Sequence, residues 1–215
     1  MAVRTPDPDP DDSSPRARGP LDDESFDSGS FGGASFDDGP LPGVGPGWLS
    51  DIELEQIRHR LPILYVEAVP VRVDGLGQVI EVGLLLRANA MGEITRTVVS
   101  GRVMYGETLR DALFRHLEKD LGPMAFPQLP ASPVPFMVAE YFPIPGVSAY
   151  SDDRQHAVSL AYVVPVTGTT EPRQDALELT WLSPSEACSS QVAAELEGGR
   201  GALVKAALAA VGVLP

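Results

Sequence analysis

One helical face near the middle of the chain brings together three side chains that could do chemistry. His116, Lys119 and Asp120 are spaced i, i+3 and i+4, so on a helix they share one face. This face is about neutral, and it becomes positive when the imidazole is protonated. One carboxylate suits Mg²⁺ poorly, because this hard cation prefers several oxygen ligands. The histidine could act as a general base, or it could be a hydrogen-bonded helix residue.

The segment around this face reads GRVMYGETLRDALFRHLEKDLGP and resembles the Nudix box, G-x5-E-x7-R-E-U-x-E-E-x-G-U, where U is a bulky aliphatic residue. Five positions match at the correct spacing: Gly101, Glu107, Arg115, Leu117 and Gly122. A strand is expected before the box, a loop and helix through it, and strands after it. A later segment, LELTWLSPSEA, resembles the strand and Trp with which the family closes. The resemblance extends over about Leu61–Ala187.

The sequence departs from the box at the positions that matter for metal binding. His116 replaces the glutamate after the arginine, Lys119 and Asp120 replace the paired glutamates, and Pro123 replaces the last aliphatic residue. In the family, carboxylates on this helix hold Mg²⁺, which bridges a diphosphate and activates the attacking water. The resemblance leaves Asp120 and the carbonyl of Gly101 as metal ligands, for Mg²⁺ or Mn²⁺. The loop acids that could complete a weaker site, or simply be solvated, are Asp152, Asp153 and Glu171.

The other box residues receive roles from the same resemblance. Glu107, Arg115, His116 and Asp120 are the candidate catalytic residues. For Glu107 and Arg115, the alternative is an ion pair that fixes the loop against the helix. Two further cations are candidate ligand-binding residues, because Lys supplies a point charge and Arg a fork for phosphate. These cations are Lys119 and Arg102, and solvated surface charge is the alternative for both.

Hydrophobic periodicity predicts the elements that position these residues. A helix is expected over Glu107–Leu121, where leucines recur every four residues, with Gly122–Pro123 ending it. Strands are expected over Ile63–Val73, Val79–Arg87, Ile94–Ser100, Phe136–Phe142, Ala157–Val166 and Leu177–Leu182. Further helices are expected from the capping box at Ser50 to about Arg60, from Pro184 with Ser183 as N-cap, and over about Gly201–Val211. Pro70 in the first strand favours an edge or a bulge. The whole predicts an α/β fold: a Nudix-type α/β/α sandwich with a mixed β-sheet.

Composition divides the chain into two regions. Residues 1–47 hold 10 Asp and Glu against 3 Lys and Arg and few aliphatic residues. They are predicted to form a disordered acidic tail before one Nudix-like domain over residues 48–215, because such a segment cannot bury enough apolar surface to offset its ordering entropy. Phe26, Phe31 and Phe36 recur in the tail at a constant spacing. They could dock a protein partner, or they could be residues without a function in a solvated low-complexity segment.

Charge and cysteine content exclude several classes of protein. The net charge of −14, without a basic stripe, argues against binding of nucleic acid duplexes or anionic membranes. The one cysteine, Cys188, excludes an internal disulfide and fits a reducing compartment. We see neither a signal peptide nor an apolar run long enough to span a membrane. A cytoplasmic protein is therefore expected.

Two functions of different classes are consistent with these residues. A divergent Nudix hydrolase would cleave a nucleoside diphosphate linked to another moiety, with water attacking phosphorus. The alternative is a catalytically silent Nudix-fold module that binds a nucleotide-like ligand or docks a protein, and the leading helix and strand could serve a homodimer. A structural domain without a ligand is the third alternative. The loops Pro127–Pro135 and Pro145–Gln155 stand where the family sets substrate choice, and they give no readable preference.

Overall fold

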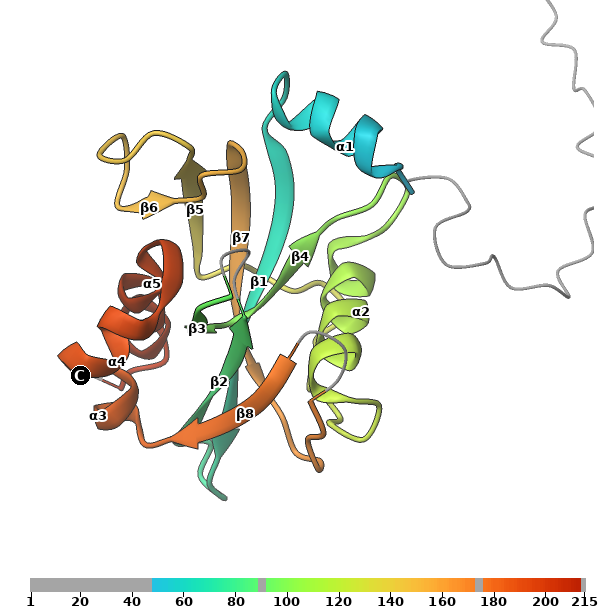
Figure 1. Ribbon diagram of the computed structural model, residues 1–215. Coiled ribbons are helices and arrows are strands. Elements are labelled where there is room, and N and C mark those ends of the chain that lie inside the picture. Colours follow the sequence, from blue (N-terminus) through green and yellow to red (C-terminus); the bar gives the residue numbers. More distant parts are fainter. Residues whose placement is uncertain (1–47, 89–91, 173–175, 214–215) are drawn as a thin grey trace, which may run out of the picture. The chain divides into compact units, whose positions relative to one another are not determined.

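The computed structural model describes residues 48–88, 92–172 and 176–213, all of which lie within the unit Pro40–Pro215. The strands of this part form one mixed sheet of eight, with helices on both faces (Figure 1). This arrangement confirms the predicted α/β/α sandwich. The predicted tail over residues 1–47 lies outside the described residues. Among the described residues, no helix is long and apolar enough to cross a membrane.

The sheet is built around β1 (Ile63–Val73), which was predicted with these bounds. The strand order is β3-β2-β1-β7-β5-β6, while β4 pairs with β1 and β8 with β2. The β1–β7 and β5–β6 pairs are parallel, and the others are antiparallel. The remaining strands are β2 (Val79–Ala88), β3 (Ile94–Thr97), β4 (Val99–Arg102), β5 (Met137–Phe142), β6 (Tyr150–Ser151), β7 (Ala157–Pro165) and β8 (Ala176–Leu182).

Pro70 lies inside the central strand β1 and not at an edge, and the irregularity in the β1–β2 pairing lies two residues later, between Arg72 and Val73. On one side of β1, β4 pairs with Tyr65–Ala68 and β2 pairs with Val71–Val73, so the partner changes at Pro70. The carbonyl of Val71 accepts a hydrogen bond from Val166 on the β7 side, so the neighbouring Pro70 faces the gap between β4 and β2. A proline fits there because no ladder hydrogen bond is lost.

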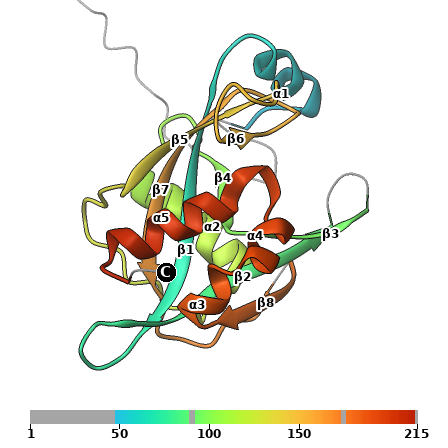
Figure 2. The ribbon, with the colours of Figure 1, turned by 90° about the vertical axis from the view of Figure 1, so that its left-hand side faces the viewer.

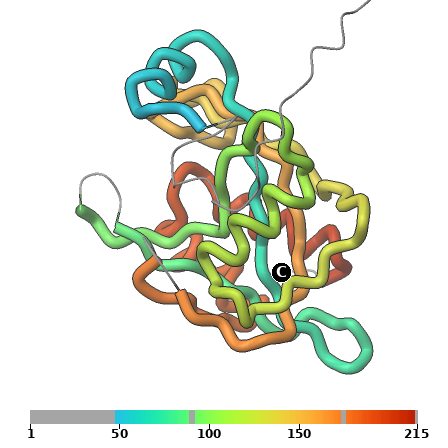
Figure 3. Tube along the Cα trace, turned by 90° about the vertical axis from the view of Figure 1, so that its right-hand side faces the viewer, coloured from blue at the N-terminus to red at the C-terminus, as the bar shows by residue number. Residues whose placement is uncertain are grey.

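Helices cover the two faces of the sheet. The helix α2 (Leu109–Leu121) packs on one face, and α5 (Arg200–Ala210) packs on the other with the short helices α3 (Pro184–Ala187) and α4 (Ser190–Glu195) and the 3-10 turn η1 (Glu197–Gly199) (Figures 2 and 3). The predicted apolar stripe of α2 is confirmed, because Leu113, Leu117 and Leu121 are fully buried. Gly122 ends α2 with a φ of 88°, a region that favours glycine.

One predicted strand is wrong in its continuity. Ile94–Ser100 was expected as a single strand, but the chain changes partner at Val98, where β3, paired with β2, gives way to β4, paired with β1. The predicted start of the box helix is also wrong, because α2 begins at Leu109. Thr108 caps α2 by accepting a hydrogen bond from the Asp111 amide, and Glu107 stays in the loop. The elements β6, α4 and η1 were not predicted at all.

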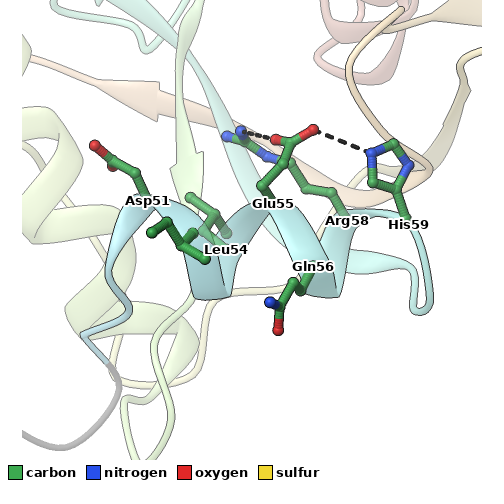
Figure 4. Close-up of a pocket in the computed structure, with 7 residues that line it drawn as sticks. Asp51, Leu54, Glu55, Gln56, Arg58 and His59 are labelled. Carbon is green, nitrogen blue, oxygen red and sulfur yellow. Dashed lines mark hydrogen bonds and ion pairs between the residues drawn. The ribbon is translucent and has the colours of Figure 1, made fainter.

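The first helix, α1 (Asp51–Arg58), stands apart from the core. Its predicted capping box, Ser50 with Glu53, is confirmed, and none of its residues is buried. A shallow pocket runs along it, in which the Glu55 carboxylate contacts Arg58 and His59 at 3.3 and 3.1 Å (Figure 4). Only residues of this helix and its C-cap line the pocket. Because no residue of the box segment reaches it, the candidate site lies elsewhere.

Candidate functional site

The loop between β4 and α2 is fastened by the ion pair of Glu107 and Arg115. Arg115 donates from Nε and Nη2 to the two Glu107 carboxylate oxygens, each at 2.7 Å, and from Nη2 to the Arg102 carbonyl at 2.9 Å. The Met104 amide donates to the same carboxylate at 3.0 Å. The ion pair expected as the structural alternative is therefore present. It joins the loop, the end of β4 and the helix into one rigid unit.

The protonation of Glu107 follows from these contacts. Burial by itself would raise the pKa of this carboxyl, but the hydrogen bonds from Arg115 and the Met104 amide, with the charge of Arg115, hold it below its ordinary value. Glu107 is therefore ionised near neutral pH. Its oxygens are occupied by Arg115, which makes it a positioning group for the loop.

His116 lies where the box has its first helix glutamate, and it is buried against the box glycine. Its Nε2 donates to the Arg102 carbonyl at 3.0 Å, and Nδ1 has no hydrogen-bond partner among the described residues. A Cβ on Gly101 would overlap the imidazole ring, so only glycine fits there. Burial, together with the charges of Arg115 and Lys119, lowers the pKa of His116 to about 4. The ring is therefore neutral near pH 7.

Asp120 is the one carboxylate that survives on the metal face, and it is fully buried. Arg87 Nη2 lies 2.6 Å from Asp120 Oδ2, and Lys119 Nζ lies 3.6 Å from Oδ1. The Arg87 contact is a close ion pair. Burial raises the pKa of Asp120, and the charges of Arg87 and Lys119 oppose that rise. Two cations thus flank the carboxylate that would hold a metal.

These residues do not fit a magnesium ion. Two metal ligands were expected, Asp120 and the carbonyl of Gly101. The Asp120 carboxylate already faces the cations Arg87 and Lys119. The described residues contain no group of three or more His, Cys, Asp or Glu side chains that could hold a metal. A cation about 4 Å from a like unit charge is repelled by about 4 kcal/mol at an effective dielectric constant near 20, and a divalent ion by twice that. The side chains at this position therefore oppose Mg²⁺.

A cavity of about 550 Å³ opens beside the box, between the β2–β3 side of the sheet, β6 and η1. Ser100, next to the box glycine, lies in its wall, and so does Arg87. The loop Pro145–Gln155 contributes to the wall, whereas Pro127–Pro135 does not. The wall residues are Arg87, Ala88, Thr95, Thr97, Ser100, Pro143, Pro145, Ser151, Asp152, Asp153, Arg154, Glu197, Gly198 and Arg200. The volume is within the range of small-molecule sites.

A buried polar cluster supports the far wall of this cavity. Glu67 on β1 is 1% exposed and accepts a hydrogen bond from Arg200 Nε at 2.7 Å and from the Tyr141 hydroxyl at 2.8 Å. The Arg200 guanidinium also lies over the Tyr141 ring, 4.8 Å from its centroid. Burial raises the pKa of Tyr141, so its hydroxyl keeps its proton and donates a hydrogen bond to the carboxylate. The cluster fixes Arg200, and with it the start of α5.

Four residues of this region were missed in the sequence: Glu67, Arg87, Tyr141 and Arg200. Each lies in a mostly apolar strand or at a helix end, and its partner is distant in the chain. A charged residue inside a run such as ILYVEAVPV was the only available signal, since a buried charge needs a partner.

The remaining predicted residues do not assemble around Asp120. Asp152 accepts hydrogen bonds from Arg154 and Gln155 in the cavity wall, and Asp153 lies beside it. Glu171 packs its main chain against the end of α2, with its amide donating to the Leu121 carbonyl at 2.8 Å. The loop acids therefore do not complete a metal site with Asp120.

Comparison with known proteins identifies a family model and solved structures that are similar to this chain. The family model described as domain of unknown function (DUF4916) matches residues 44–213. A search of curated proteins finds no match. The crystal structure of a possible asymmetric diadenosine tetraphosphate (Ap4A) hydrolase from Jonesia denitrificans is similar at 63% identity and a TM-score of 0.71, over 73% of this chain and 98% of that chain.

More distant structures share the fold. An Ap4A hydrolase from C. elegans, solved as a binary complex, matches at 13% identity and a TM-score of 0.52, over 70% of this chain and 98% of that chain. The NUDIX domain of Shewanella oneidensis NrtR, solved with ADP ribose, matches at 16% identity and a TM-score of 0.50, over 69% of this chain and 87% of that chain. The chain belongs to the DUF4916 family and has the fold of the Nudix proteins.

Proposed function

We propose that this protein binds a nucleoside diphosphate linked to another moiety in the cavity beside the Nudix box, and that the box is a weak site for Mg²⁺ or Mn²⁺ that does not drive hydrolysis. The observation that carries this proposal is the contact of Arg87 with Asp120 at 2.6 Å. The one remaining carboxylate of the metal face is engaged by protein cations. A metal ion would have to displace them before it could activate water.

The cavity supports a ligand of this class. Its volume of about 550 Å³ is enough for a nucleotide derivative, and its wall combines three arginines with the hydroxyl groups of Thr95, Thr97 and Ser100. Arginine suits phosphate, and hydroxyl groups can accept or donate hydrogen bonds to a sugar or base. The NUDIX domain solved with ADP ribose is a fold relative that holds a ligand of this kind.

A divergent hydrolase is the second candidate function, and the 63% identical structure of a possible Ap4A hydrolase favours it. In that case Asp120 and the Gly101 carbonyl would hold the metal, and water would attack phosphorus and release a nucleotide. Glu107, Arg115 and His116 would support the reaction, with Arg102 and Lys119 on the phosphates. This function requires Arg87 to leave Asp120 when substrate binds.

A paired measurement tests the two candidates. Melting temperatures with ADP-ribose and with Ap4A report binding, because a ligand of the native state stabilises it. A hydrolysis assay of the same compounds with Mg²⁺ or Mn²⁺ reports turnover. We expect a rise in melting temperature and no product. Product formation that an Asp120→Asn variant abolishes would establish the hydrolase, and no shift with either compound would contradict both candidates.

The predicted homodimer and the protein partner of the acidic tail stay predictions. So does the cytoplasmic location.

A further inference from the structure

Arg87 is placed at the metal position by the sheet. It lies on β2, opposite Thr95 of β3 and Ala176 of β8. Leu85, two residues earlier on the same strand, is buried in the cluster that contains the α2 leucines. Side chains two residues apart on a strand share a face, so Arg87 also points towards α2. Its guanidinium therefore meets Asp120, where the box helix presents its carboxylate.

The same guanidinium also forms part of the cavity wall. Its Nη2 atom lies 2.6 Å from Asp120 Oδ2, and its Nε atom is buried without a hydrogen-bond partner in the described part of the chain. A guanidinium is always protonated, and its planar fork suits phosphate oxygens. Arg87 is therefore a fixed cation that Asp120 holds at the edge of the cavity.

The charges around the cavity favour binding of an anion beside Arg87 and not at the other walls of the cavity. Near Arg87, Lys119 adds a second cation against the one carboxylate of Asp120. The other two arginines of the wall are each paired with a carboxylate of their own. Asp153 and Glu197 add negative charge on the β6 and η1 side. A phosphate group would be repelled there and attracted to Arg87.

We propose that Arg87 takes the place of the divalent cation of the Nudix box and binds a phosphate group of the ligand directly, so that binding needs no metal. Asp120 is then a positioning residue, because it holds the guanidinium and does not touch the ligand. The sugar and base lie towards the hydroxyl groups and carboxylates of the other walls. This inference rests on the proposed function, since it concerns the same cavity and ligand class.

Calorimetric titration with ADP-ribose tests the inference. The dissociation constant should be the same within about twofold in excess EDTA and in excess Mg²⁺, because no metal takes part. The Arg87→Met variant should bind ADP-ribose about tenfold to a hundredfold more weakly in both solutions, which is the usual range for a lost hydrogen bond to a charged group.

Two further variants keep the test interpretable. Arg72→Met is the matched control, because Arg72 also pairs with a carboxylate, Glu81, but lies outside the cavity. It should bind ADP-ribose like the wild type. Arg87→Met leaves Asp120 buried beside Lys119 alone and could unfold the domain. The double variant Arg87→Met with Asp120→Asn removes both charges, so it should stay folded in a melting experiment and still bind weakly.

The outcomes separate this inference from the proposed function. Binding that appears only with Mg²⁺ would overturn the role of Arg87 and leave the proposed function standing. A folded double variant that binds ADP-ribose as tightly as the wild type would also overturn the role of Arg87 and leave the proposed function standing. If ADP-ribose binds in neither solution, the inference and the proposed binding of this ligand both fail.

Discussion

Replacement of Glu67 by glutamine should destabilise the domain strongly, although it changes one atom of a side chain. The carboxylate is 1% exposed and is the counterion of Arg200, which lies 2.7 Å away and is itself mostly buried. An amide can still accept a hydrogen bond from Tyr141, but it carries no charge. The Glu67→Gln variant therefore leaves a buried guanidinium without a counterion.

The size of the effect follows from this burial. Removal of one partner of a buried ion pair costs about 3–5 kcal/mol, because the other charge remains desolvated. In a domain of this size, each kcal/mol lowers the melting temperature by about 2–4 °C. The variant should therefore melt about 6–20 °C below the wild type.

Thermal unfolding followed by circular dichroism measures this difference, and the Glu81→Gln variant is its matched control. Glu81 forms an ion pair with Arg72 at 3.1 Å, but both side chains are more than a third exposed. Exposed pairs contribute at most about 1 kcal/mol, so the control should fall by no more than about 4 °C. If Glu67→Gln melts no lower than Glu81→Gln, the buried cluster does not stabilise the fold and this reasoning is wrong.

Three more predictions concern the box. Gly101→Ala should lower the free energy of unfolding by about 1–3 kcal/mol in denaturant titration, because the added methyl overlaps the His116 ring; adding His116→Ala should restore part of the loss. The pKa of His116 is about 4 in the folded protein and 6.5 in the unfolded chain, so the unfolded chain binds a proton at higher pH. As the pH falls from 6.5 to 4, the domain should therefore lose up to about 3 kcal/mol of stability. The His116→Gln variant should not show this loss. The triple variant His116→Glu, Lys119→Glu and Asp120→Glu should bind Mg²⁺ only weakly in calorimetry while Arg87 remains, and tightly once Arg87→Met is added. Tight binding without Arg87→Met would contradict the role of Arg87.

Much of the fold could be predicted from the sequence, because its signals are local. The β-branched run of β1, the leucine stripe of α2 and the capping serines at Ser50 and Ser183 specify their elements within a few residues of chain. The break at Val98 could not be predicted. It depends on which strand lies on either side, and β3 and β4 pair with different neighbours.

The candidate site divides in the same way. The pairing of Glu107 with Arg115 could be expected from their positions in the box, and the structure has it. The partner of Asp120 could not be expected, because Arg87 is distant in sequence and comes into contact only when β2 packs against α2. The same holds for Glu67 and Arg200, which are separated by most of the domain.

By itself, the sequence determined the order of elements, the box helix and the loss of carboxylates from its metal face, since each depends on residue type and short spacing. Only the tertiary structure decided what replaces those carboxylates. A charge inside a protein must be balanced by whatever side chains the packing brings within a few ångströms. Here β2 brings Arg87 to Asp120, at the wall of a cavity that no short segment of the chain could specify.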